Sequence, residues 1–265
     1  MNLRIIITII SITFTIGAYG QREFKIPLSK PGEDVFLKVD IRTGPVTVVG
    51  TNRQDVLVRY ESMEEEDVNI SETKDGLKKI SGGSTGIEVI ERNNEITIET
   101  ENWHKGLRVY LEVPRACDMS INTYHDGDIS ISDIDGDIEA ETFHGPIKAM
   151  NIAGSLVANT FHGGVQATFR EVTPDAPFAF STYHGDVDVT FPASFKADMK
   201  IKTERGEIYT GFDIAFSQTQ PQLRQEKSEK GYRAYVDGWI RGTVNGGGPE
   251  VMMKNHHGDV YIRKQ

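Results

Sequence analysis

Histidine is the residue type whose spacing in this chain is most suggestive of chemistry. Four of the seven histidines follow a Thr and an aromatic residue; three of them stand just before a Gly, and in the fourth case one Asp intervenes. A fifth histidine ends a degenerate copy of the same phrase. Neutral imidazole is a common ligand of zinc and other transition metals. If the fold aligns these positions, adjacent repeats can offer imidazoles to one metal ion. The residues are His125, His144, His162 and His184, with His257 as the fifth.

A structural ladder is the alternative interpretation of the same histidines. In a ladder each ring stacks on the next and covers the turn, and a repeat that arises by duplication copies the residue without selection for a ligand. We favour the ladder and keep His125, His144, His162 and His184 as candidate metal ligands. No other cofactor is expected. Closely stacked imidazoles disfavour simultaneous protonation, so some should titrate below about 6.5.

Carboxylates near the histidines raise the question of calcium. Aspartates occupy five positions of the turns between residues 126 and 137. The calcium-binding nonapeptide, however, needs Gly-Gly-x-Gly-x-Asp, and that pattern is absent. The acidic cluster Glu64–Asp67 is likewise interpreted as a solvated loop. We therefore expect these carboxylates to face water.

The usual catalytic patterns are missing. The loop Ser81–Gly86 lacks the Gly-Lys-Ser/Thr ending that brings a lysine to phosphate. No serine stands in a nucleophile elbow, and no carboxylate pair has an assignable glycosidase geometry. The sequence therefore predicts a protein that is not an enzyme.

Strands of a short repeat must position the histidines. Gly127, Gly136, Gly145, Gly154 and Gly163 follow one another at intervals of nine residues. The third letter of each unit is Ile, Leu or Val and the fifth is Ile or Ala, which is the period-two pattern of a half-buried strand. The glycine supplies the turn. Every second unit ends in Thr-Phe-His, so the longer period is eighteen.

Two all-β architectures fit this repeat. In a β-solenoid, two units make one coil, and like positions stack about 4.8 Å apart. In an antiparallel meander or sandwich, each unit is one strand of an ordinary sheet. The eighteen-residue period favours the solenoid and places His144 beside His162. We expect the apolar letters to point inward: Ile129, Ile131, Ile138, Ile147, Leu156 and Val165, together with Phe143 and Phe161.

The chain divides into five segments. Residues 1–20 have the form of a secretory signal peptide, with Arg4, an apolar run and Ala18-Tyr19-Gly20 before the cleavage point. The apolar run is short for a membrane span, and an uncleaved anchor is the alternative. We expect an exported protein with no transmembrane segment after cleavage. The other segments are an N-terminal β region (21–113), the repeat core (114–211), a polar insertion loop (212–235) and a closing C-terminal coil (236–265).

Composition narrows the class of partner. The chain carries 39 acidic and 29 basic residues, a net charge of −10, which argues against binding to nucleic acid or anionic lipid. The single cysteine, Cys117, excludes an internal disulfide bond. It lies in a strand-like run and is interpreted as a buried apolar residue rather than a reactive thiol.

Several motifs carry a resemblance to a known family. They are Leu37-Lys-Val-Asp40, Gly44-Pro-Val-Thr-Val48, Val113-Pro-Arg-Ala116, the Gly-Asp-Ile/Val corners, Val244–Pro249 and Gly258–Arg263. Over roughly residues 24–263 the chain resembles exported bacterial β-strand-repeat proteins that are described as candidate adhesins with a domain of unknown function. The resemblance implies a β-helical, adhesin-like protein of the cell envelope and supplies no catalytic residue. The histidine before the glycine departs from the family's small polar corner.

These observations lead to one functional expectation and two alternatives. We expect a non-enzymatic exported protein whose β-solenoid surface binds an envelope or extracellular ligand, either a glycan or a protein. Its place is the periplasm, the outer-membrane surface or the exterior. The alternatives are a carbohydrate-active enzyme on a β-helix, with Lys, Arg and Asp gathered on one face, and an envelope scaffold that assembles through open sheet edges.

Overall fold

The computed structural model describes residues 22–63, 73–74, 77–78, 86–100, 105–173, 176–218, 222–228 and 231–265. Within these ranges the chain is all-β and contains no helix. The expected signal peptide and the loop Glu64–Asp67 lie outside the described residues, as does Ser81–Gly86 except for its last residue.

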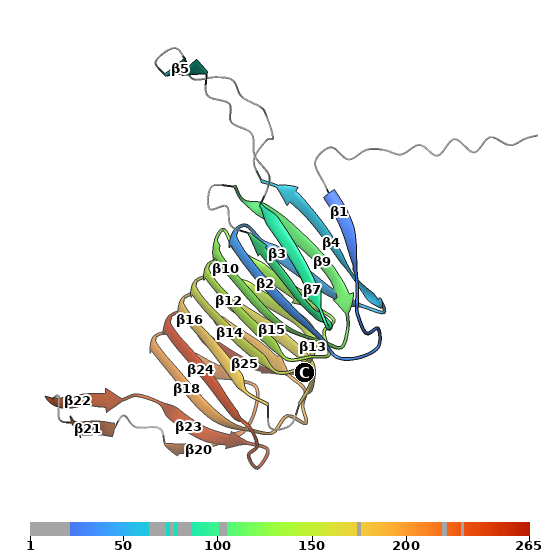
Figure 1. Ribbon diagram of the computed structural model, residues 1–265. Helices are drawn as coiled ribbons and strands as arrows, with labels where there is room; N and C mark the ends of the chain where they lie inside the picture. The colour runs from blue at the N-terminus through green and yellow to red at the C-terminus, as the bar shows by residue number, and fades with distance from the viewer. Residues whose placement is uncertain are drawn as a thin grey trace, which may run out of the picture.

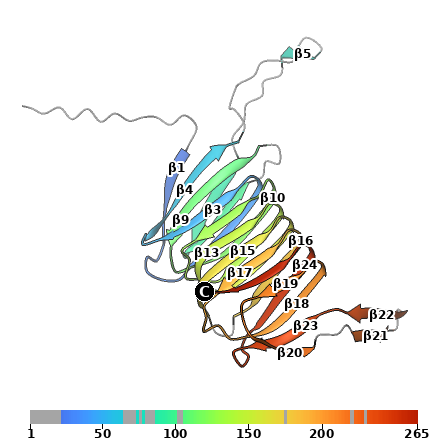
Figure 2. The same cartoon turned by 180° about the vertical axis from the view of Figure 1, so that it is seen from behind.

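Two large mixed sheets form the body (Figures 1 and 2). In spatial order, the ten-stranded sheet A contains β1 (Arg22–Pro27), β4 (Asp55–Ser62), β9 (Leu107–Pro114), β3 (Val46–Thr51), β11 (Ile129–Ser132), β13 (Ile147–Gly154), β15 (Val165–Val172), β17 (Val187–Phe191), β25 (Val260–Lys264) and β19 (Ile208–Thr210). The eleven-stranded sheet B contains β20 (Ile214–Gln218), β23 (Ile240–Val244), β18 (Ala197–Arg205), β24 (Glu250–His257), β16 (Phe178–His184), β14 (Leu156–His162), β12 (Ile138–His144), β10 (Cys117–His125), β2 (Val35–Thr43), β8 (Glu95–Thr100) and β7 (Ile87–Arg92).

The repeat strands alternate between the two sheets. Each pairs in parallel with the strand two places along the chain, as in β10–β12–β14–β16 and β11–β13–β15–β17. Ile138 lies opposite Leu156 and Ile147 opposite Val165, an offset of eighteen residues that agrees with the longer sequence period. The antiparallel pairing of chain neighbours that a meander requires does not occur between these strands. Antiparallel pairs instead flank the stack, at β1–β4–β9 and β7–β8 and at β18–β23–β20.

The inward side chains of the two sheets form one core. The six aliphatic residues expected inside are buried, because they occupy alternate positions of strands that carry their core on one face. Near the C-terminal coils the core is aromatic, with Phe169 and Phe191 stacked at a centroid distance of 5.2 Å. Cys117 is also buried, and burial raises the pKa of its thiol to about 12. It packs as a small apolar residue, as the sequence indicates.

Phe143 and Phe161 point outward, so the sequence-based prediction for them was wrong. In their strands the buried positions are Ile138, Ala140 and Thr142 and their counterparts, and each Phe stands an odd number of residues from them. Strand geometry therefore turns the rings to the opposite face. Phe161 remains 38% exposed, and the small Thr142 and Thr160 take the inward places.

The C-terminal coil does not close the stack as expected. Strand β24 lies between β16 and β18, and β25 lies between β17 and β19, so the last coil sits one step inside. The region expected as a polar loop contains β20 and the hairpin of β21 (Gln222–Ser228) with β22 (Gly231–Asp237). A second small hairpin joins β5 (Thr73–Lys74) to β6 (Leu77–Lys78).

Two phenylalanines on neighbouring strands test this inward register. Phe180 on β16 is fully buried, so Phe180→Ala should cost about 3–5 kcal/mol of unfolding free energy. Phe161→Ala on β14 removes only ring contacts at the surface and should cost about 0.5–1.5 kcal/mol. Urea unfolding of the two variants gives both values. Equal losses would contradict the register.

Candidate binding surface

The predicted histidines form one column at a corner of sheet B. Successive rings stack almost in parallel, with centroids 5.3 Å apart for His125–His144 and 5.0 Å for both His144–His162 and His162–His184. His257 continues the column at 4.8 Å from His184. The register predicted from the sequence is confirmed, because His144 lies directly opposite His162 on the adjacent parallel strand.

The residues around each histidine tie one coil to the next. The Thr two positions before it points inward. The hydroxyls of Thr160 and Thr182 donate to a glycine carbonyl of the neighbouring coil, Gly145 at 2.9 Å and Gly163 at 2.7 Å. Those of Thr123 and Thr142 donate to carbonyls that follow in their own coil, Gly127 and His144. The glycine after the histidine donates its N–H to the next histidine carbonyl, at 2.8 Å from Gly145 to His162. Asn255 replaces the Thr in the last coil and donates to Gly185.

Glycine is required at this corner. Gly163 has a φ of +151°, and a Cβ built on it would stand 2.2 Å from the carbonyl oxygen of Gly145. Residues that carry a side chain rarely adopt that backbone conformation. The atoms that the Cβ would meet belong to the backbone, so they cannot move away as a flexible side chain would. The glycine period thus reflects close contact between coils as well as the turn.

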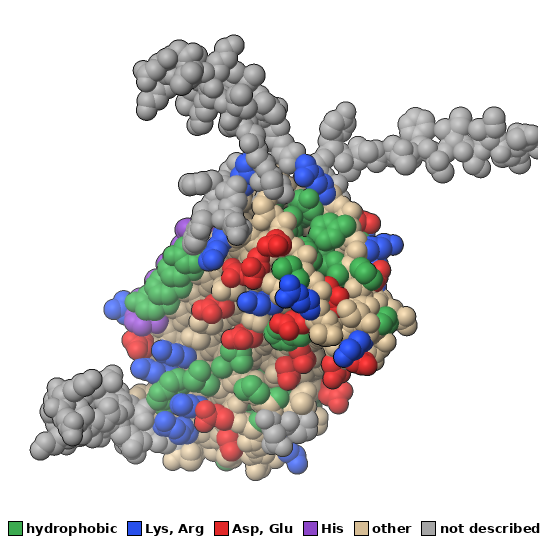
Figure 3. Space-filling model, viewed as in Figure 1, with side chains coloured by type: hydrophobic (Ala, Val, Ile, Leu, Met, Phe, Trp, Pro, Cys, Tyr) green, Lys and Arg blue, Asp and Glu red, His purple; other side chains and the backbone are tan. Residues whose placement is uncertain are grey.

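A second column of aromatic rings runs beside the histidines. Its stacked centroid distances are 5.0 Å for Tyr124–Phe143, 4.9 Å for Phe143–Phe161, 4.7 Å for Phe161–Tyr183 and 4.3 Å for Tyr183–His256. Tyr124, Phe161 and Tyr183 are 41%, 38% and 36% exposed. Figure 3 shows such a band of hydrophobic side chains with histidines along it. Sequence reasoning missed this column. The signal was present, because each aromatic residue stands an odd number of positions from the inward residues of its strand and must therefore point outward.

A shallow groove of about 530 Å³ follows the aromatic column. In each strand, the residue two positions before the aromatic ring is polar, and these polar side chains form the other side of the groove. These side chains supply amide, hydroxyl, carboxylate and ammonium groups, which suit hydrogen bonding to a ligand, whereas the rings supply apolar edges. We call them the polar row; in the groove its members are Asn122, Glu141, Asn159, Ser181 and Lys254.

The histidine column is electrostatically coupled. Partial desolvation lowers the pKa of His162 below its usual value, and the neighbouring His144 and His184 lower it further. Desolvation also lowers the pKa of His257, with His256 and Arg205 acting in the same direction. A positive charge on one ring disfavours a charge on the next. The lowered pKa values of His162 and His257 agree with the expectation that some of the stacked histidines titrate below the usual value.

Metal ligation by the column needs nitrogens of neighbouring rings close to one another. Two nitrogens that bind one zinc ion at 2.0–2.1 Å lie no more than about 4.2 Å apart, and the rings of His144 and His162 stack with their centroids 5.0 Å apart. Among the described residues, no three His, Cys, Asp or Glu side chains are grouped to hold a metal. Metal binding by His125, His144, His162 and His184 stays a prediction.

The turn aspartates are engaged by the protein. Asp137 accepts hydrogen bonds from the Ser155 backbone and hydroxyl, at 3.1 Å and 2.7 Å. Asp133 accepts from Asn151 at 2.5 Å and faces Arg115. These contacts hold neighbouring coils together at the turns.

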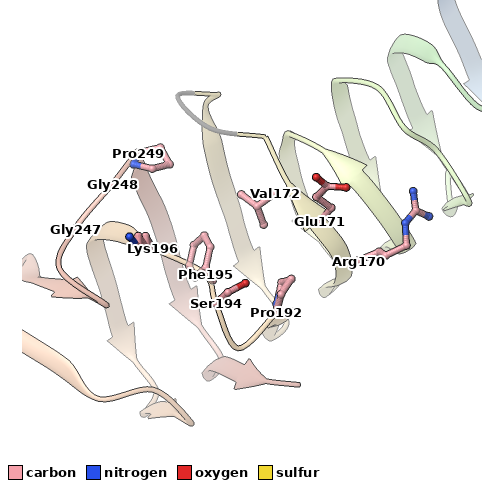
Figure 4. Close-up of a pocket in the computed structure, with 10 residues that line it drawn as sticks. All are labelled: Arg170, Glu171, Val172, Pro192, Ser194, Phe195, Lys196, Gly247, Gly248 and Pro249. Carbon is pink, nitrogen blue, oxygen red and sulfur yellow. The ribbon is translucent and has the colours of Figure 1, made fainter.

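A second hollow of about 490 Å³ lies among the C-terminal repeat strands, at the strand ends remote from the histidine corner (Figure 4). Phe195, Val172 and two prolines give it an apolar lining, and Lys196, Glu171 and Ser194 add polar groups. The Arg170 side chain extends away from Phe195 in this view and pairs with Asp135 at 2.5 Å. Among the described residues that line it, none is a histidine that would serve as a base for Ser194.

Comparisons with known proteins bear on the fold alone. No family model matches the chain, and no curated protein matches it. The structure of a candidate cell adhesion protein from Clostridium sporogenes is similar, with a TM-score of 0.52 and 12% identity over 92% of this chain and 100% of that one. A candidate adhesin from Bacteroides fragilis gives a TM-score of 0.40 and 10% identity over 92% and 98%. Among the described residues, no helix has the length and apolar character to span a membrane.

Gly163 and its neighbour Gly164 form a matched pair for testing the corner. Gly163→Ala should destabilise the fold by at least about 1–3 kcal/mol, the strain of the backbone conformation, with the clash in addition. Gly164→Ala should cost markedly less, because a Cβ there would lie 3.1 Å from its nearest atom, the Asp186 carbonyl oxygen. Thermal and urea unfolding check the order. A larger loss for Gly164→Ala would contradict the close approach.

The lowered pKa of His162 predicts weaker folding in acid. The unfolded chain takes up this proton near pH 6.5, whereas the folded chain does so only at lower pH. The unfolded state binds more protons in that window, so the unfolding free energy should fall as the pH decreases from about 6.5 through the lowered folded pKa. Urea unfolding across this range measures the slope. His162→Asn should reduce it, and an unchanged slope would contradict the assignment.

Proposed function

We propose that this chain is an exported, non-enzymatic protein of the cell envelope, a β-solenoid adhesin that binds its partner through the outer face of sheet B. The observation that carries the proposal is the groove in which an exposed aromatic column faces the polar row, with one member of each per coil. Aromatic side chains with adjacent hydrogen-bonding groups are typical of recognition surfaces.

The pairing pattern supports the solenoid part of the proposal. The parallel offset of eighteen residues repeats in both sheets, and the chain passes from one sheet to the other at each glycine corner. Such a stack builds a long regular face from short units. An aromatic contact made by one coil is then repeated at the next, which suits the binding of an extended or multivalent partner.

Non-enzymatic action is supported by the distribution of charge. Carbohydrate-active enzymes on β-helices gather Lys, Arg and Asp on one face, which was the alternative from the sequence. In the groove the only Lys or Arg is Lys254, while Arg170, at the rim of the second hollow, is paired with Asp135. The form of residues 1–20 supports export. The adhesin descriptions of the two similar structures agree with an adhesive role.

A binding experiment on residues 21–265 tests the proposal. Labelled protein is incubated with envelope fractions and a glycan array, and bound protein is measured. We expect binding that weakens about tenfold or more in the Phe143→Ala/Phe161→Ala double variant. Met150→Ala on sheet A is the matched control, because it removes a side chain of similar exposure (40%) from another face and should have no effect.

Two outcomes would overturn the proposal. Absence of binding to every fraction and glycan would remove adhesion to a foreign envelope ligand. Binding that survives the double variant would move the site away from the groove. Release of sugars from envelope or plant-type polysaccharides by the purified chain would favour the enzyme alternative.

A further inference from the structure

The polar row carries a graded charge along the stack. Strand pairing extends it from β2 to β18, with the side chains in register from one strand to the next. One end is acidic, the centre is neutral and the other end is basic. In order, the residues are Asp40, Asn122, Glu141, Asn159, Ser181, Lys254 and Lys202.

This order is self-complementary when the stack is reversed. Consider a two-fold axis that lies between two facing copies, parallel to the strands and midway between β14 and β16. Asn159 then meets Ser181 of the other copy, and Glu141 meets Lys254. Further out, Asn122 meets Lys202. Each charged contact occurs twice, as an isologous interface requires.

The aromatic column obeys the same operation. Phe161 faces Tyr183 of the other copy, and Phe143 faces His256, because the rings stand two residues beyond the polar row on each strand. The centre of the interface is then aromatic, and the ion pairs lie on either side of it. This is the arrangement of anchors and flanking polar contacts found in specific interfaces.

We propose that the partner of this face is a second copy of the chain, bound face to face with its stack reversed. The proposal rests on the proposed function and names its partner, since copies on two cells would join them by self-recognition.

Local features of the face favour a second copy over other occupants. The interior strands of sheet B already use their backbone groups in pairing, so this face cannot accept an added strand as an edge would. The stacked rings bury their flat faces against one another and offer their edges outward, which leaves no platform for a sugar ring. The polar row, in contrast, is complementary to the same row of a reversed copy, because its acidic end then meets the basic end of the other row.

Acidic groups at the far edge of the face do not oppose the pairing strongly. Asp118 and Asp137 accept hydrogen bonds from turn N–H groups, which hold their carboxylates against their own coil. Glu250 lies 3.9 Å from Lys200. The six strands that the axis relates, about 4.8 Å apart, and six residues of about 3.3 Å each give a face of roughly 570 Å² per copy, at the lower limit of a standard interface. We therefore expect micromolar self-association.

Charge exchange provides the test. Sedimentation equilibrium of residues 21–265 over a range of concentrations should show a monomer–dimer equilibrium that weakens with salt. Glu141→Lys alone, or Lys254→Glu alone, places like charges together twice and should weaken the dimer about tenfold or more. The Glu141→Lys/Lys254→Glu double variant exchanges the two charges and should restore it. Glu171→Lys on sheet A is the control for the change in net charge.

A monomer at all concentrations would overturn the proposal, as would a double variant no tighter than the single ones. A chain that stays monomeric yet binds envelope fractions or glycans would refute self-recognition while leaving the adhesive function intact. A chain that dimerises as predicted but fails to bind any fraction would support the self-partner and remove the need for a foreign ligand.

Discussion

Close contact between glycine backbones at the corner of each coil is the constraint on which the rest of this structure depends. Gly145, Gly163 and Gly185 each approach the corner of a neighbouring coil at a distance that leaves no room for a Cβ. Their N–H groups donate to histidine carbonyls of the adjacent strand. Because the corners cannot slide past one another, every strand of the repeat is held in register with its neighbour.

Because the register is fixed, the residue at one position of the repeat lies beside the same position of the next repeat, and the two become members of a column. An inward Thr becomes a row of hydroxyls bonded to glycine carbonyls, and an outward aromatic residue becomes a continuous stack. Stacking gives each ring partners on both flat faces and leaves only its edge to water. The histidines gain the same contacts, but a column of ionisable rings also accumulates repulsion when protonated. One geometry therefore stabilises the corner and lowers the pKa of His162 within it.

Two sheets of parallel strands must also protect their edges, since unpaired strand edges invite association. Here antiparallel strands flank the parallel ones at both ends of sheet B, with β7 on one side and β20 and β23 on the other. Sheet A has antiparallel β1 and β4 at one end, and its other edge is the short parallel strand β19. The outer face of sheet B is thereby left as a broad regular surface between these antiparallel ends, and it is the surface to which we assign the proposed binding.

The sequence by itself determined the features that depend on local period. The glycine interval, the inward Ile138 and Leu156, and the alignment of His144 with His162 all follow from a repeat whose units must adopt the same conformation. The sequence also contained the outward direction of Phe143, because this residue stands an odd number of positions from the inward residues of its strand. Its hydrophobicity suggested instead that it belongs to the core. Only the tertiary structure decided that β24 enters between β16 and β18. Those strands are far apart in the chain, and their order depends on which edges remain unpaired, a property that no local pattern records. The groove has the same origin, because its lining comes from separate coils that meet only after the strands have paired.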